Sequence, residues 1–391
     1  MPQPILGILT LYISNDKRLE EGPIYERMIS EGQKIGLDVF VFTPADVHYS
    51  KNLIHALVYD PKTSKWSRKW RAFPDMIFDR CRIQQGRRFE QLKRFRAHYG
   101  HLLYLNKPLR NKWITHQILS ENPRFRRHLP ETVLYESIRD VRHMLKSKPL
   151  VFLKPINGTG GRGILRIQRI DAGCFSIQGR NNERKIITPR IIHASSLRAA
   201  LDGWNMRKRY IIQEGIPLQL PSGRVHDYRM LVQKNGQGEW VLTGCAGRIG
   251  AKNSVTSNLH GGGNAVPMVS MLRQWIGEEE QRHNIRDEAE QLGLDVAAYL
   301  EESIGPLCEL ALDLAIDKQG NIYILEVNPK PAREVFNRIG EKEIYRQAIV
   351  KPLEYALWLY KQHTESSDQD TNATRSELDI TTLSPEQEDA P

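Results

Sequence analysis

Three side chains suited to binding a metal ion stand on one stretch of chain, residues 310–329. Two apolar runs flank a polar, glycine-containing turn there, which predicts a β-hairpin. With the turn centred on Gln319-Gly320, Asp313 lies across from Glu326. Asn328 then points to the same face as Glu326. Two carboxylates on one apolar patch repel each other unless a cation lies between them. The hairpin therefore predicts a site for one or two Mg²⁺ ions, with Mn²⁺ as the alternative, and a phosphate-bearing ligand nearby.

A glycine-rich segment lies upstream, between the predicted strands Leu150–Pro155 and Ile164–Ile167. Such a loop accepts positive φ angles, and its successive N–H groups form a concave anion site. Lys154 ends the first strand and can reach phosphate as a point charge. The order strand–loop–strand excludes a Walker loop and a Rossmann fingerprint, because both need a helix after the glycines. A flexible glycine hairpin without a ligand is the alternative. The candidate loop residues are Gly158, Thr159, Gly160, Gly161 and Gly163.

Together the two motifs resemble those of the ATP-grasp superfamily, in which lysines, a mobile glycine hairpin and an Asp…Glu-x-Asn set hold Mg·ATP between two α+β subdomains. The resemblance covers about residues 105–335. It implies a fold of the α/β and α+β classes, with ATP and Mg²⁺ as cofactors. A closer resemblance is to YheC/YheD-type proteins, some of them described as endospore coat-associated. It rests on four segments, Gly7–Thr10, Phe40–Pro44, Val327–Pro331 and Pro352–Ala356.

The resemblance also implies residue roles. Lys112 and Lys154 match the two ATP lysines, while Arg229 and Arg248 match arginines that face the transferred phosphoryl group. Alternatively, either arginine simply pairs with Asp227 or with an acid of the tail. The implied catalytic residues are Arg229, Arg248 and Lys154. The implied nucleotide-binding residues are Lys112, Lys154, Gly158, Thr159, Gly160, Gly161, Gly163, Asn258 and, in the hinge strand whose backbone pairs with adenine, Gln213, Glu214 and Ile216. The metal ligands are Asp313, Glu326 and Asn328. Residues 218–223 lack the acid that usually binds ribose, so no ribose ligand is assigned.

The implied reaction is ligation. ATP phosphorylates a carboxylate, and an amine or thiol then takes the acyl group, with ADP and phosphate as products. The substrates stay unidentified. A second hypothesis is a nucleotide-binding structural or spore coat-associated protein with little turnover. A third is a polyanion binder acting through residues 62–112, which hold fifteen Lys or Arg and three acids. No nucleic-acid motif accompanies this block, so a solvated basic face, or a contact for the acidic tail, is an equal alternative.

Composition places the chain among soluble globular proteins with two or three subdomains, at 391 residues, 40% hydrophobic and 26% charged. No apolar run has the length of a membrane helix, and the N-terminus lacks a signal-type core. The four scattered cysteines indicate reduced thiols without a zinc site. These features predict a cytoplasmic protein; a location in the mother cell or spore coat comes only from the resemblance.

The predicted elements divide the chain into four parts. Strand 5–13, helix 23–36 and strand 37–43 form a βαβ start, which favours a parallel sheet. Asn111 and Ser137 are N-caps for helices 112–119 and 138–145. The predicted domains are a pre-ATP-grasp α/β domain (1–110), a linker helix with the lid (111–212), a catalytic subdomain (213–363) that ends in helix 341–361, and a disordered acidic tail (364–391).

Overall fold

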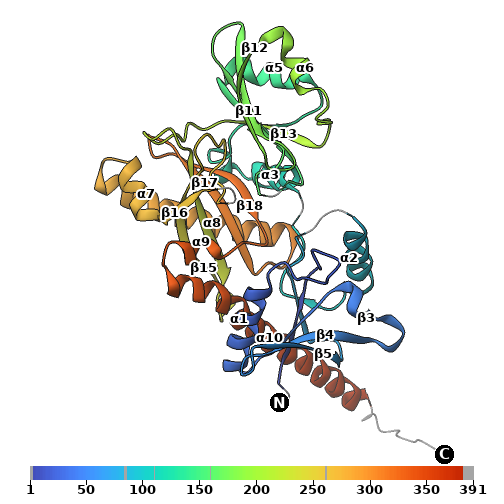
Figure 1. The fold of residues 1–391 in the computed structure, drawn as a ribbon. Helices are drawn as coiled ribbons and strands as arrows, with labels where there is room; N and C mark the ends of the chain where they lie inside the picture. Colours follow the sequence, from blue (N-terminus) through green and yellow to red (C-terminus); the bar gives the residue numbers. More distant parts are fainter. Residues whose placement is uncertain (1–2, 83–85, 110, 159, 260–261, 382–391) are drawn as a thin grey trace, which may run out of the picture.

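The computed structural model describes residues 3–82, 86–109, 111–158, 160–259 and 262–381, with side chains described up to residue 365. Three β-sheets form three bodies (Figure 1). A five-stranded central sheet lies between a six-stranded sheet, which we call the lid, and a seven-stranded sheet, which we call the first domain. The functional residues must therefore be sought where the three bodies meet.

The first domain begins with the predicted βαβ unit, since β1 pairs in parallel with β2. The sheet order is β3-β4-β2-β1-β6-β7, and β5 pairs with β4. β5 was not predicted; it lies inside the basic block and pairs with β4 along its whole length. The elements are β1 (Ile5–Leu9), α1 (Gly22–Lys34), β2 (Asp38–Phe42), β3 (Val47–His48), β4 (Leu53–Asp60), β5 (Lys65–Arg71), β6 (Met76–Asp79), α2 (Arg87–His98) and β7 (Leu103–Tyr104).

The lid is an antiparallel sheet of order β12-β11-β10-β9-β13-β8 with its own apolar core. Both predicted N-caps are confirmed: Asn111 Oδ1 accepts from the Ile114 N–H at 3.1 Å, and Ser137 forms a capping box with Asp140. Helices α3 (Lys112–Glu121) and α4 (Pro123–Arg126) precede the lid sheet and pack against the core of the central sheet. The lid elements are β8 (Thr132–Leu134), α5 (Ile138–Ser147), β9 (Leu150–Pro155), β10 (Ile164–Arg169), β11 (Cys174–Arg180), β12 (Ile186–His193), α6 (Leu197–Leu201) and β13 (Tyr210–Glu214).

The central sheet has the order β16-β15-β14-β17-β18 and is antiparallel. Its long helix α8 buries Ile285, Ala289, Leu292, Val296 and Leu300, a spacing of three or four residues that places them on one face. That face shares one core with β14 and β17. The elements are β14 (His226–Lys234), β15 (Trp240–Ile249), β16 (Asn264–Pro267), α7 (Met268–Trp275), α8 (Glu279–Ile304), β17 (Glu309–Ile316), β18 (Ile322–Asn328), α9 (Glu334–Arg338) and α10 (Lys342–Thr381).

Fully buried ion pairs join the first domain to the central sheet. The Glu309 carboxylate at the start of β17 accepts from both Arg80 and Arg333. Arg80 also pairs with Glu21 at 2.7 Å, and Gln233 Nε2 donates to Glu309 at 3.0 Å. We call these residues, Glu21, Arg80, Gln233, Glu309 and Arg333, the junction cluster. It ties the residues directly after β6 and directly before α1 to β14, β17 and the segment before α9.

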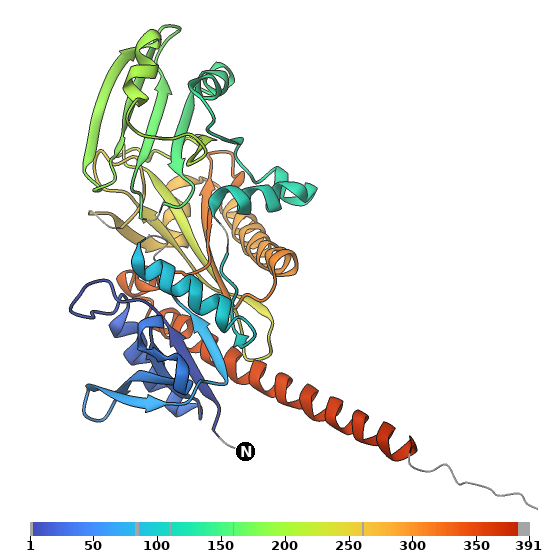
Figure 2. The same ribbon diagram turned by 90° about the vertical axis from the view of Figure 1, so that its right-hand side faces the viewer.

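Helix α10 differs from its predicted bounds. We expected a helix over 341–361 and a disordered tail after it, but α10 extends to Thr381. The prediction rested on the loss of apolar periodicity, whereas residues 353–381 contain no proline or glycine to end a helix. Figure 2 shows α10 leaving the body of the molecule as a single long helix. The domain boundaries otherwise stay a prediction.

Across the described residues, no helix combines the length and the apolarity that crossing a membrane would require.

Candidate active site

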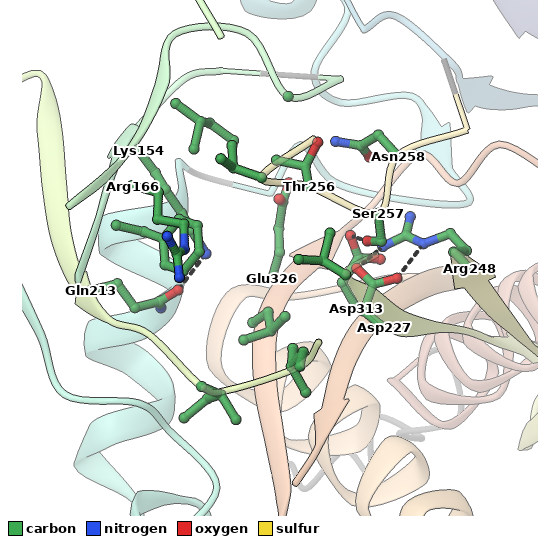
Figure 3. A pocket seen from close by; sticks show the side chains of 18 of the residues that line it. Lys154, Arg166, Gln213, Asp227, Arg248, Thr256, Ser257, Asn258, Asp313 and Glu326 are labelled. Atoms are coloured by element: carbon green, nitrogen blue, oxygen red, sulfur yellow. Dashed lines mark hydrogen bonds and ion pairs between the residues drawn. The ribbon is translucent and has the colours of Figure 1, made fainter. Parts of the chain in front are cut away.

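A cavity of about 280 Å³ lies between the lid and the central sheet. With one exception, Gly163, every predicted site residue that the structure describes lines it; Thr159 lies outside the described residues. In Figure 3, Lys154, Arg166 and Gln213 lie on one side, Asp227, Arg248 and Asp313 on the other, and Glu326 between them. The lining residues from the prediction are Lys112, Lys154, Gly158, Gly160, Gly161, Gln213, Glu214, Ile216, Arg229, Arg248, Asn258, Asp313, Glu326 and Asn328.

Two lysines point cations into the cavity from the lid side. Lys154 Nζ donates to Gln213 Oε1 at 2.5 Å, and burial lowers the pKa of Lys154 from 10.5 to about 8, against the attraction of Glu326. Lys112, the first residue of α3, donates to the Gly158 carbonyl and lies 3.5 Å from Glu326 Oε1. A cation at a helix N-terminus is unfavourable, so this position gains from a bound anion.

The glycine loop adopts the backbone that the sequence predicts. Gly160, Gly161 and Gly163 all have positive φ, between 65° and 74°. A Cβ at Gly161 would lie 2.6 Å from Asn258 Nδ2, so the loop packs closely against the segment that carries Asn258. His260 and Gly261, which follow Asn258 closely in the chain, lie outside the described residues. The close approach leaves the loop backbone facing the cavity.

On the sheet side, two arginines and two aspartates form a buried group. Arg248 makes a two-pronged contact with Asp227 at 2.7 and 2.6 Å, and Asp313 lies 3.0 Å from Arg248 and 2.7 Å from Arg229. Burial by itself would raise the pKa of Asp313, but the two guanidinium groups lower it below its ordinary value. The pairing with Asp227, which we left open as an alternative, is therefore present for Arg248, and it also fixes where that guanidinium points.

The predicted register of the hairpin is confirmed: Asp313 pairs with Glu326, and Ala311 with Asn328. The predicted turn centre is off by half a residue, since Ile316 pairs with Ile322. A β-bulge makes up the difference, because Leu314 pairs with Ile324 and leaves Leu325 as the extra residue. The bulge thereby sets Asp313 opposite Glu326.

The oxygen donors suit Mg²⁺, but repulsion between the two carboxylates is not the reason. Among the described residues, no three His, Cys, Asp or Glu side chains gather as a metal site; the expected set is two carboxylates and the Asn328 amide. Arg229, Arg248 and Lys112 already offset the charges of Asp313 and Glu326, so repulsion alone does not demand a metal. Hard oxygens open to one cavity still suit Mg²⁺, which takes few protein ligands. The metal site stays a prediction.

The hinge strand β13 forms the inner wall of the cavity. Gln213 is buried between Lys154 and Thr132, whose Oγ1 accepts from Gln213 Nε2 at 3.1 Å. The Glu214 side chain points to Lys148 at 2.8 Å, which leaves its backbone for any contact with a ligand. Gln219 also lines the cavity, beyond the hinge. No acid lies at residues 218–223, so the ribose ligand remains unassigned.

Sequence reasoning missed Arg166 on β10. This arginine is buried, lines the cavity, and donates to Gln168 Oε1 at 2.8 Å. Within the described part of the chain it makes no ion pair, and burial lowers its pKa. The available signal was a cation between Leu165 and Ile167 in a strand that follows the glycine loop. A buried guanidinium without a carboxylate is costly unless a ligand supplies the anion.

The chain belongs to the YheC/D-like ATP-grasp family, whose model matches residues 101–359. The family and fold class predicted from the sequence are therefore confirmed. Two similar proteins of Bacillus subtilis (strain 168) are named endospore coat-associated proteins. YheD is 24% identical over 372 residues, 93% of this chain and 81% of YheD; YheC is 25% identical over 365 residues, 92% and 98%.

A solved structure with a similar fold is that of the D-cycloserine synthetase DcsG. It is 14% identical, with a TM-score of 0.54, over 92% of this chain and 99% of DcsG. At this identity the likeness concerns the fold alone, and it agrees with an ATP-grasp arrangement of lid and central sheet.

Proposed function

We propose that this chain is an ATP-dependent ligase that joins a carboxylate to an amine or a thiol. The observation that carries the proposal is one cavity with phosphate-type cations on its lid side, Lys112 and Lys154, and paired carboxylates on its sheet side, Asp313 and Glu326. ATP fits this division, with its base at the hinge strand β13 and its phosphates between the lysines and the glycine loop. Membership in the ATP-grasp family supports the same assignment.

The reaction would proceed in two steps. A carboxylate oxygen attacks the γ-phosphorus, the bond to the bridging oxygen breaks, and ADP leaves with that electron pair. The amine or thiol then attacks the acyl carbon, phosphate leaves with the electrons of the C–O bond, and the nucleophile's proton passes to solvent. The protein contributes position and charge: Lys112 and Lys154 bind phosphate oxygens, and Arg229 and Arg248 face the transferred group.

Asp313, Glu326 and Asn328 would hold one or two Mg²⁺ ions, or Mn²⁺, whose charge would offset that of the phosphate oxygens. Asp227 and Asp313 hold the two arginines in place before any ligand binds, so these groups need little reorganisation. The lid would exclude the water that hydrolyses an acyl phosphate.

A second candidate is a nucleotide-binding protein of the spore coat with little turnover. The names of the similar YheC and YheD proteins favour it. Under either candidate, a link to sporulation and a cytoplasmic, mother-cell location are part of the proposal.

The test is release of ADP and phosphate from Mg·ATP with pools of amino acids, short peptides and cell-wall precursors. We expect substrate-dependent release, reduced at least about 100-fold in Glu326→Gln, an effect typical of losing one charge-stabilising group. Glu288→Gln, in an exposed ion pair with Arg127, is the matched control and should retain full activity. Tight nucleotide binding without turnover for any pool would favour the structural candidate instead.

A further inference from the structure

A second cavity, of about 640 Å³, adjoins the nucleotide cavity at its phosphate end. The two share walls, among them Lys112, Gly158, Arg248 and Asn258. The other walls of the second cavity come from the first domain, from the tip of the lid and from residues 329–338. A molecule bound in it would thus lie next to the γ-phosphate and within reach of all three bodies.

The wall of this second cavity is strongly cationic. Among the described residues that line it, eight are lysine or arginine and three are glutamate. Several of these cations are already neutralised inside the protein. Arg96 and Lys330 both contact the buried Asp79, at 2.5 and 2.7 Å, and Arg82 contacts Glu21 at 2.7 Å. The cations that matter for a ligand are those that lack such a partner.

Arg184, at the tip of the lid between β11 and β12, is such a cation. It makes no ion pair within the described residues, and its Nε is buried without a hydrogen-bond partner. Its charged neighbours are Arg162 and Arg180, and burial together with these two lowers the pKa of Arg184. The guanidinium lies over the glycine loop, because a Cβ at Gly160 would be 2.6 Å from its Nη2.

The backbone at Arg184 is also unusual. Its φ is +67°, in the left-handed region where glycine or asparagine is common and other residues cost about 1 kcal/mol or more. The tight turn from Asn181 to Lys185 imposes this conformation, since Asn181 Oδ1 accepts from the Glu183 and Lys185 N–H groups at 3.1 and 2.8 Å. A long cation at this turn position extends from the lid toward the wall that the two cavities share.

We infer that the second cavity takes the acceptor substrate as an anion, and that Arg184 of the lid binds an oxyanion group of that acceptor, a carboxylate or a phosphate. That the ligand is the acceptor rests on the proposed function. Its anionic class rests on the charge of the wall and on Arg184. Because Arg184 belongs to the lid, acceptor binding would favour lid closure over the bound nucleotide.

The experiment titrates three probes into the full chain carrying Mg·AMP-PNP: glutarate, its neutral diamide glutaramide, and inorganic phosphate. Ligand-observed NMR follows binding, with and without the nucleotide. We expect glutarate or phosphate to bind at least about tenfold more tightly than glutaramide, as a charge-assisted pair predicts. The anion that binds better identifies the source of the oxyanion. Arg184→Met should remove most of that preference and change AMP-PNP affinity less than twofold.

Arg190→Met is the matched control, an exposed arginine on β12 of the same sheet, and should bind the probes as the wild type does. Equal affinity for glutarate, phosphate and glutaramide, or unchanged binding in Arg184→Met, would overturn the inference. If AMP-PNP does not bind but the anion preference persists and depends on Arg184, the anion site stands and the proposed ATP-dependent reaction is what fails.

Discussion

The junction cluster and the nucleotide cavity both concentrate buried charge. They differ in whether each charged side chain has an oppositely charged partner within the chain. At the junction, Glu309 accepts from Arg80 and Arg333, all three fully buried, and Glu21 holds Arg80 as well. In the cavity, Lys154 and Arg166 lack an acid partner among the described residues. Buried ions that are paired inside the chain, at the junction and around Asp313, hold parts of the structure in place, whereas the cations on the lid side without an acid partner are available to a ligand.

The largest effect should come from breaking the junction. Glu309→Gln leaves Arg80 and Arg333 buried without their shared carboxylate, which we expect to lower the free energy of unfolding by about 3–5 kcal/mol. Urea denaturation followed by circular dichroism measures it. Glu288→Gln, which removes an exposed pair with Arg127, should cost less than about 1 kcal/mol. Equal losses in the two variants would mean that the junction cluster does not hold the domains together.

In the cavity, removing a buried charge should raise the free energy of unfolding instead of lowering it. The pKa of Lys154 is about 8 in the folded chain instead of 10.5, so the folded chain holds this proton less tightly than the unfolded chain. The charged Lys154 therefore lowers the free energy of unfolding by the full amount below pH 8. This loss shrinks as the pH rises toward 10.5. A shift of this size corresponds to about 3 kcal/mol, and contact with cavity water reduces it to about 1–2 kcal/mol.

Lys154→Met should therefore stabilise the ligand-free protein at pH 7 by about 1–2 kcal/mol. The gain should shrink between pH 8 and pH 10.5 in denaturation curves taken across that range. The same variant should bind ATP more weakly, which separates a ligand-binding cation from a structural one. A loss of stability at pH 7 would place Lys154 with the junction charges instead.

The next largest effect is expected at Arg166, where the comparison concerns nucleotide affinity. Arg166→Met should weaken ATP binding about tenfold, because it removes one charge-assisted contact, and it should not destabilise the ligand-free protein, because the buried guanidinium lacks a carboxylate partner among the described residues. Isothermal titration with AMP-PNP measures it. Arg169→Met, at the other end of β10, removes only a contact with the Lys146 carbonyl at 3.1 Å and should leave affinity unchanged. If both variants bind equally well, the ligand does not supply the anion that Arg166 lacks.

The smallest effect is expected at the hinge. Lys148 pairs with Glu214 at 2.8 Å, and both side chains are about a quarter exposed. Lys148→Met should cost less than about 1 kcal/mol of stability and change nucleotide affinity less than twofold, because the Glu214 side chain is engaged by Lys148 and the proposed adenine contact is with the backbone of β13. A larger loss of affinity would show that this ion pair sets the position of β13.

Much of the candidate site could be predicted because its local signals are strong. Asn111 and Ser137 sit where caps belong, and the glycine loop requires positive φ. The pairing of Asp313 with Glu326 was predicted correctly from a turn centre half a residue away, and the bulge at Leu325 reconciled the two. A bulge leaves no mark in the pattern of apolar residues, so its contribution could be seen only in the folded sheet.

Other features depend on contacts between distant segments. β5 contains four Lys or Arg in its seven residues, a composition that we interpreted as a basic block and not as a strand, yet it pairs with β4 over its full length. In the junction cluster, Arg80 and Arg333 share the carboxylate of Glu309. No residue near Arg80 in the sequence indicates that this distant pairing exists. Arg166 and Arg184 were missed for the same reason, because the role of an arginine depends on the residues that surround it in the folded structure.

The apolar clusters of the molecule cannot all form at the same stage of synthesis. The lid core closes within residues 141–212, so it can form as soon as that stretch has been made. One face of the first domain must wait, because Leu6, Tyr25 and Val41 share their core with Ala348, Leu353 and Ala356 of α10. During synthesis these residues of the first domain therefore stay exposed until α10 has left the ribosome. A chain that stops before residue 342 would leave that face uncovered, which makes the C-terminal helix a checkpoint for newly made protein.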